Sequence, residues 1–223
     1  MAHWADIPIY VIDFEGATKT GVVEYGVVEL CNGKIASTAT RLCAPMAELT
    51  LRDTRLHGIA QRDVSNCAPF ADEWERFRNW RGQGVFGAHH ASVEQGLLKQ
   101  QWSYPPTSPD SLHGGKVADW GPWVDTRRLY EVVYPDLESY KLGALVACFA
   151  LQSKLEELAH EHCPDSRRKA HCALYDALAS ALLLQRLGAE PGFEAMTIAW
   201  LLEHSLPSHE KRQAAQQQQL FDE

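Results

Sequence analysis

The chain opens with three apolar runs, "IPIYVIDF" at residues 7–14, "VVEYGVVEL" at 22–30 and a third at 34–43. Apolar and β-branched residues dominate the first two runs, which is typical of largely buried strands. The tetrapeptide "CNGK" at 31–34 joins the second and third runs. Because Asn-Gly favours a tight hairpin turn, the three runs predict an antiparallel meander.

Aromatic residues recur at helical spacing in "PFADEWERFRNW" at residues 69–80. The stripe consists of Phe70, Trp74, Phe77 and Trp80. Such a stripe could pack in a core or could offer a platform for stacking bases. Apolar residues at this period mark the buried face of a helix, so we interpret the stripe as core.

Helical patterns dominate the rest of the chain, after one more short strand in "GVFGAHH" at 84–90. Helices are expected over 91–101, 125–133, 139–151 and 171–187, with a turn-rich stretch at 103–116. This order predicts an α/β fold with a mixed central sheet, the meander plus parallel strands, flanked by helices. We place one domain at 1–187, and a C-terminal helical extension with a flexible polar tail at 188–223.

Composition places the chain among ordinary globular proteins, with 223 residues of which 45% are hydrophobic. The first residues carry no signal-peptide pattern. The longest apolar stretch, at 142–151, is about half of what a bilayer crossing requires. The six cysteines are scattered without a paired framework, so reduced thiols are expected. We therefore predict a cytoplasmic protein without membrane contact.

Two acids stand close together where the first strand ends. Asp13 and Glu15 are two residues apart, so both side chains point to the same side of the sheet. Two like charges at a partly buried edge disfavour each other's ionisation, and a cation would relieve the repulsion. A solvated strand end with incidental acids is the alternative interpretation.

Two further segments carry groups suited to hydrolysis. His171 precedes Asp176 in "HCALYDALASALLL" at 171–184, so a histidine and a carboxylate meet at the start of a helix. Glu94 follows a short strand in "GAHHASVEQGLL" at 87–98. Taken alone, each of these residues could equally be an ordinary surface group.

Together the three segments resemble the motifs of the DnaQ-like (DEDDh) 3′–5′ exonuclease superfamily, which includes the proofreading epsilon subunit of bacterial DNA polymerase III. The matching stretches read "DFE", "HHASVE" and "HCALYDA" in this chain, and the resemblance extends over roughly 7–187. It implies a ribonuclease H-like exonuclease fold. It also implies hydrolysis at the 3′ end of single-stranded DNA or RNA, with release of nucleoside 5′-monophosphates.

The resemblance assigns a role to each matching residue. Asp13 matches the acid that bridges two metal ions, and Glu15 and Asp176 match ligands of the first ion. His171 matches the general base. Glu94 stands where the family has an aspartate, which puts the affinity for the second ion in doubt. His90 replaces the usual asparagine, a second departure.

Oxygen ligands imply two Mg²⁺ or Mn²⁺ ions as cofactors, because hard cations prefer carboxylates. Phe14, His57 and Arg168 lie in segments that match the family, and we expect them to bind the substrate. The net charge of −8 requires any grip on phosphate to be local. Candidate basic spots lie at 51–55, 125–129 and 166–171, although each could be plain solvated surface.

Two alternatives to an active exonuclease remain open at this point. Glu94 and His90 could mark a catalytically weakened nucleic-acid-binding or polymerase-associated module. A zinc site could form instead from the cluster His160, His162, Cys163, His171 and Cys172, although their spacing is not a standard zinc pattern.

The tail carries one further signal, "QQQLF" at 217–221, which resembles the peptide by which bacterial replication proteins dock on the sliding clamp. Gln217 would supply hydrogen bonds, while Leu220 and Phe221 would enter an apolar pocket. A glutamine-rich end also arises by chance, and a plain solvated tail is the simpler interpretation.

Overall fold

The computed structural model describes residues 2–193 and 195–207. Five strands form one mixed sheet in the order β3-β2-β1-β4-β7. Strands β1 to β3 are antiparallel neighbours, and β4 and β7 add in parallel, which confirms the predicted meander and the mixed sheet. The strands are β1 (Ile9–Ala17), β2 (Gly21–Cys31), β3 (Lys34–Leu42), β4 (Val85–Ala88) and β7 (Trp123–Asp125), with a separate pair β5 (Ser108–Pro109) and β6 (Lys116–Val117).

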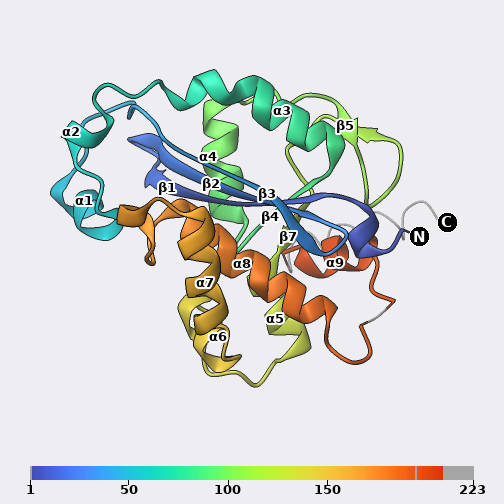
Figure 1. The fold of residues 1–223 in the computed structure, drawn as a ribbon. Coiled ribbons are helices and arrows are strands. Elements are labelled where there is room, and N and C mark those ends of the chain that lie inside the picture. Colours follow the sequence, from blue (N-terminus) through green and yellow to red (C-terminus); the bar gives the residue numbers. More distant parts are fainter. Residues whose placement is uncertain (1, 194, 208–223) are drawn as a thin grey trace.

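Helices cover both faces of this sheet, with α3 and α4 on one side and α5 to α9 on the other (Figure 1). The α-helices are α1 (Leu51–His57), α2 (Gln61–Val64), α3 (Trp74–Gln83), α4 (Ser92–Gln101), α5 (Thr126–Val133), α6 (Leu142–Cys148), α7 (Gln152–His162), α8 (Ala173–Gly188) and α9 (Ile198–Ser205). Three short 3-10 helices are η1 (Trp4–Asp6), η2 (Phe70–Glu73) and η3 (Asp165–Arg167).

The predicted aromatic stripe belongs to the core under α3. Phe70 and Phe77 are fully buried, and their rings meet edge to face with centroids 5.1 Å apart. Trp74 and Trp80 are partly buried against the same cluster. The interpretation of this stripe as core is therefore confirmed, and these rings are not a platform for bases.

The sequence patterns missed helix α7 and strand β7. The helix expected over 139–151 ends early, because Ala150 has a φ of 55°, in the left-handed region that interrupts a helix. A new helix then begins at Gln152. Strand β7 has only three residues, too few for a periodic signal.

Helix α9 follows the predicted domain boundary at residue 187 and packs into the same core as α8. Ile198, Leu201 and Leu202 are buried there, and the Ser205 hydroxyl accepts the Asp125 backbone N–H at 2.8 Å. Among the described residues, no helix is long and apolar enough to cross a membrane. The proposed clamp-binding residues Gln217, Leu220 and Phe221 lie outside the described residues.

The first turn of α8 lies directly on strand β2 at Gly26. A Cβ atom at Gly26 would stand 2.2 Å from the Leu174 backbone nitrogen and 2.3 Å from the Ala173 carbonyl carbon. Only a residue without a side chain permits this approach. The contact fixes the start of α8 over the end of the sheet that carries Asp13 and Glu15.

We expect Gly26→Ala to lower the free energy of unfolding by about 1–3 kcal/mol or more, because backbone atoms cannot yield to the added methyl group. Gly96→Ala is the matched control. It lies in helix α4, where a Cβ atom meets nothing within 4 Å, and should be neutral or stabilising. Thermal unfolding followed by circular dichroism measures both, and an unchanged melting temperature for Gly26→Ala would contradict the packing described.

Candidate active site

Strand β1 presents its acids toward helix α8. Asp13 pairs with Gly26 and Glu15 pairs with Glu24 across the antiparallel ladder, so these side chains share the face on which α8 lies. Phe14, between the two acids, points to the opposite face, where its ring contacts Phe70 and Phe77. Because side chains alternate along β1, the two acids lie on one face of the sheet and Phe14 lies in the aromatic core on the other.

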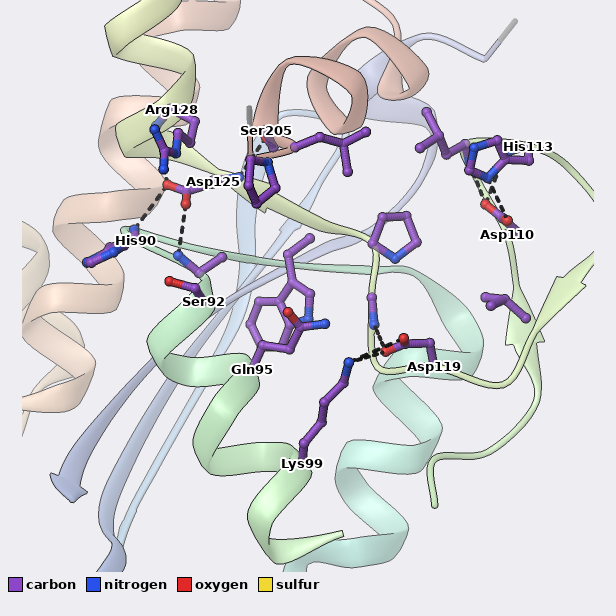
Figure 2. Close-up of a pocket in the computed structure, with 18 residues that line it drawn as sticks. His90, Ser92, Gln95, Lys99, Asp110, His113, Asp119, Asp125, Arg128 and Ser205 are labelled. Carbon is purple, nitrogen blue, oxygen red and sulfur yellow. Dashed lines mark hydrogen bonds and ion pairs between the residues drawn. The ribbon is translucent and has the colours of Figure 1, made fainter. Parts of the chain in front are cut away.

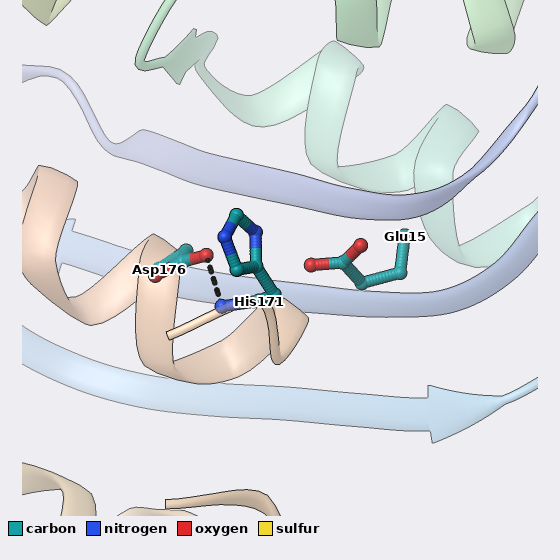
Figure 3. A group of neighbouring side chains, drawn as sticks. All are labelled: Glu15, His171 and Asp176. Carbon is teal, nitrogen blue, oxygen red and sulfur yellow. Dashed lines mark hydrogen bonds between the residues drawn. The ribbon is translucent and has the colours of Figure 1, made fainter. Parts of the chain in front are cut away.

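Helix α8 and the segment before it supply two further groups. His171 has a φ of 60°, and its backbone N–H donates to the Asp176 Oδ2 at 2.9 Å. One ligand atom each from Glu15, His171 and Asp176 lies within 4.8 Å of the other two. Figure 3 shows the His171 ring between the two carboxylates. The three residues form the one such cluster of metal-ligating atoms in the described part of the chain.

Helix α4 contributes Glu94 from its first turn. The side chain is 5% exposed, and its Oε2 has no hydrogen-bond partner among the described residues. A buried carboxylate oxygen without a partner is costly unless a cation or donor satisfies it. The unpartnered Oε2 of Glu94 is therefore a candidate metal ligand.

The departure at His90 has a backbone explanation. His90 has a φ of 71°, and its N–H donates to the Asp125 Oδ1 at 3.0 Å. Asparagine and histidine are both enriched among the non-glycine residues that adopt left-handed φ values. His90 can therefore replace an asparagine without changing how α4 begins.

A buried ion pair supports the cluster from behind. Glu24 is 2% exposed, and its two carboxylate oxygens accept bonds from the Arg167 guanidinium. Glu24 Oε2 also accepts the Ala173 N–H at 2.9 Å, so a strand residue caps helix α8. Arg167 Nη1 donates to the His57 carbonyl oxygen at 2.6 Å. The pair therefore joins β2, the end of α1 and the start of α8.

Sequence patterns gave no sign that Glu24 and Arg167 act together. The signal that could have found Glu24 was a charged residue inside the apolar run 22–30. Such a residue needs a buried partner.

The site concentrates negative charge away from water. Burial, followed by Asp176, Glu94 and Glu15, holds the pKa of Asp13 well above its usual range. Burial and neighbouring acids likewise raise the pKa of Glu15 to about 8. Arg167 acts in the opposite direction on Glu15.

The other two acids are shifted in the same direction. Burial, with Asp125 and Glu15 adding to it, raises the pKa of Glu94 to about 8. Burial also raises the pKa of Asp176 to about 6, although the N–H of His171 opposes the shift. All four acids would therefore ionise more readily beside a cation.

The three expected substrate-binding residues lie in different settings. The Phe14 side chain is in the aromatic core, so only its backbone could reach a substrate. His57 is buried, its Nδ1 accepts the Ile59 N–H at 3.1 Å, and its Nε2 has no partner among the described residues. Arg168 donates to the carbonyl oxygens of His160 and Cys163 at the end of α7.

The alternative zinc cluster does not assemble among the described residues. His171 joins Glu15 and Asp176 instead of Cys163 or Cys172. All six cysteines are free. Burial raises the pKa of the Cys163 thiol and of the Cys172 thiol to about 11, which disfavours the thiolate form that zinc binds.

A separate cavity of about 520 Å³ lies between α4, the loop before β7 and the end of α9 (Figure 2). The expected site residues do not line it. Its charged side chains are largely paired with one another, as Lys99 is with Asp119 and His113 with Asp110. The cavity is therefore distinct from the acid cluster.

Comparison with known proteins gives the same architecture. A family model described as exonuclease (RNase_T) matches residues 11–184. The DNA polymerase III PolC-type proteins of Oceanobacillus iheyensis and Bacillus subtilis are 26% identical over 166 residues and 25% identical over 176 residues. These matches cover 74% and 78% of this chain but 10% and 11% of the relatives. The chain thus spans about a tenth of the length of these curated relatives.

Solved structures share the fold. One is Exonuclease X in complex with 5′ overhanging duplex DNA, with a TM-score of 0.61, 22% identity and coverage of 87% of this chain and 99% of that chain. Another is the nuclease domain of 3′hExo, a DEDDh family member, bound to rAMP, with a TM-score of 0.59, 17% identity and coverage of 86% and 96%. The predicted ribonuclease H-like exonuclease fold is confirmed.

We expect Glu15→Gln to stabilise the metal-free protein at pH 8. The pKa of Glu15 is about 8 in the folded protein and 4.5 ordinarily, so the folded state retains a proton that the unfolded chain loses between these values. Stability of the wild type therefore falls as pH rises through this window, and a neutral glutamine avoids that loss. The gain should exceed about 1 kcal/mol, since one pKa unit is worth about 1.4 kcal/mol.

Thermal unfolding in EDTA at pH 5 and pH 8 measures this effect. The advantage of Glu15→Gln should be large at pH 8 and small at pH 5. The exposed Glu48→Gln is the control and should show no such dependence. A Glu15→Gln protein less stable than the wild type at pH 8 would refute the repulsion between the acids.

Proposed function

The chain belongs to the exonuclease family, and we propose that it removes nucleotides one at a time from the 3′ ends of single-stranded nucleic acid, using divalent metal ions. The observation that carries the proposal is that Glu94, Asp176 and His171 converge around Asp13 and Glu15 of strand β1. Three separate segments bring these groups together, each from a different element. Such an arrangement suits hydrolysis better than any structural task.

The donor set fits metal binding. The raised pKa values of the acids and the unpartnered Oε2 of Glu94 both call for positive charge. Asp13, Glu15 and Asp176 would hold one ion, and Asp13 and Glu94 would hold the other. Oxygen ligands favour Mg²⁺ or Mn²⁺. When bound, two such ions would activate water and stabilise the leaving 3′-oxygen.

His171 is the proposed general base. Its ring is exposed to solvent, so it can accept a proton from a water molecule and return it to bulk solvent. Its backbone is fixed by the bond from its N–H to Asp176. The ring also lies close enough to Glu15 and Asp176 to serve as a ligand. We assign proton transfer to His171, and a substitution at this position can test that role separately from metal affinity.

The substrate end would lie against α1. His57 Nδ1 accepts a backbone N–H, so its proton is on Nε2, a buried donor without an acceptor among the described residues. Burial lowers the pKa of His57 and keeps the ring neutral. We propose that this N–H donates to an oxygen of the terminal nucleotide. Related structures include one with duplex DNA and one with rAMP, so DNA and RNA ends are both tested below.

The cysteines bear on the cellular location of the protein. Six free cysteines suit a reducing compartment, which supports the cytoplasm as the proposed location.

A catalytically weakened nucleic-acid-binding module is the second candidate function, and the glutamate at position 94 favours it. His90 no longer argues for this second candidate, because its left-handed backbone accounts for the replacement of asparagine.

The deciding experiment is a degradation assay on matched end-labelled DNA and RNA oligonucleotides with Mg²⁺ or Mn²⁺. We expect release of mononucleotides from free 3′ ends, no product in EDTA and no cutting of circular single strands. Asp13→Asn should abolish activity, because it removes a metal ligand and leaves the fold intact. The exposed Asp72→Asn should behave as the wild type. More than a few per cent of activity in Asp13→Asn would sink the assignment.

A second experiment concerns the length of the acid on α4. Glu94→Asp restores the family residue and should keep or raise activity, whereas Glu94→Gln keeps the length but removes the charge. We expect Glu94→Gln to weaken apparent Mn²⁺ affinity by at least about tenfold. Manganese titration of activity and of protein stability measures both variants. Complete inactivation of Glu94→Asp would mean that the local backbone has adapted to glutamate.

A further inference from the structure

The acid cluster creates an electrostatic problem for a nucleic-acid enzyme. The chain has a net charge of −8, and four carboxylates converge where a phosphate must arrive. Affinity for a phosphate backbone comes from lysine and arginine side chains that are free to contact it. The proposed divalent ions would offset the acids at the reacting phosphate, so a grip on the neighbouring phosphates needs a local cation that no internal carboxylate already neutralises.

Three basic residues, Arg167, Arg168 and Lys169, precede His171. Arg167 is committed inside the protein, since it binds Glu24 and the His57 carbonyl oxygen. Arg168 is engaged at the end of α7, through two carbonyl oxygens and an ion pair with Asp165 at 2.6 Å. Both arginines hold the segment in place.

Lys169 is different. It is exposed, and it makes no ion pair or hydrogen bond with any residue that the structure describes. Its Nζ lies 3.6 Å from the position that a Cβ atom would occupy at Gly58. Gly58 has a φ of 74° and ends helix α1, so the ammonium group lies over the end of that helix, at ordinary van der Waals distance from where a side chain would begin.

The ammonium group of Lys169 lies beside the end of helix α1, which carries His57. Gly58 follows His57, whose buried Nε2 lacks an acceptor among the described residues. Lys169 is two residues from His171. Figure 1 shows the segment that enters α8 beside α1, in agreement with the bond from Arg167 to the His57 carbonyl oxygen. A cation without an ion pair among the described residues therefore lies next to the residue that follows His57, and two positions before His171 in the chain.

We propose that Lys169 contacts the sugar–phosphate backbone of the single strand near its 3′ end, in a subsite formed over Gly58. The inference rests on the proposed exonuclease function and adds a substrate-binding residue to it. A flexible ammonium group reads charge and not sequence, so this contact would act equally on all base sequences. Arg167 and Arg168 serve as the frame that holds Lys169 in position.

The test compares three substitutions in the full chain. Lys169→Gln removes the proposed contact, Arg168→Gln removes the same charge from the neighbouring residue, and Lys34→Gln removes it from the hairpin at the far end of the sheet. KM and kcat are measured on a labelled single strand with Mg²⁺. Binding of the same strand in EDTA is measured by fluorescence anisotropy across a salt series.

For Lys169→Gln we expect KM to rise several-fold with kcat within about twofold of the wild type, as for loss of uniform binding. The slope of log affinity against log salt should fall by about one. Lys169→Arg should restore both quantities, and Lys34→Gln should change neither.

Equal effects of Lys169→Gln and Lys34→Gln would overturn the proposal, since only general charge would then be at work. A larger fall in the salt slope for Arg168→Gln than for Lys169→Gln would also overturn it, because Arg168 would then be the cation that contacts phosphate. A wild-type protein that degrades nothing would refute the exonuclease function instead, while the salt series would still decide the role of Lys169.

Discussion

The contact between helix α8 and strand β2 governs everything else in this site. At Gly26 the two backbones meet without an intervening side chain, and beside it Glu24 accepts the buried N–H of Ala173. A helix start placed this way puts Asp176 opposite the acids of β1. Its position is set by backbone contact, which is far less tolerant of adjustment than packing between side chains.

This geometry places charge where water cannot screen it. Four acids share the region, and the Arg167 guanidinium is already bound by Glu24. The protein thus holds an arrangement that is unfavourable in isolation, which is common where function demands a destabilised site. The large core on either side of the sheet supplies the stability that tolerates it.

Sequence patterns predicted the meander and the α/β class. The resemblance of three short segments to a known family marked Asp13, Glu15, Glu94, His171 and Asp176, which the structure brings together. Neither could predict the pairing of Glu24 with Arg167, residues 143 positions apart, since only the folded chain brings them together. The break at Ala150 was equally hidden, because an alanine gives no local sign of a left-handed φ. The reason why histidine can replace asparagine at position 90 became clear only from its left-handed φ.

The bond from the His171 N–H to Asp176 makes two parts of the site interdependent. In the proposed mechanism this one carboxylate would both orient the histidine and bind a metal ion, so substituting it would perturb both tasks at once. Effects of changes at these two positions should therefore not add, and the shortfall in a double-mutant cycle would report their coupling free energy. The left-handed backbone of His171 sharpens this dependence, because without the anchoring carboxylate the loop could relax to an unstrained conformation and move the imidazole away from Glu15.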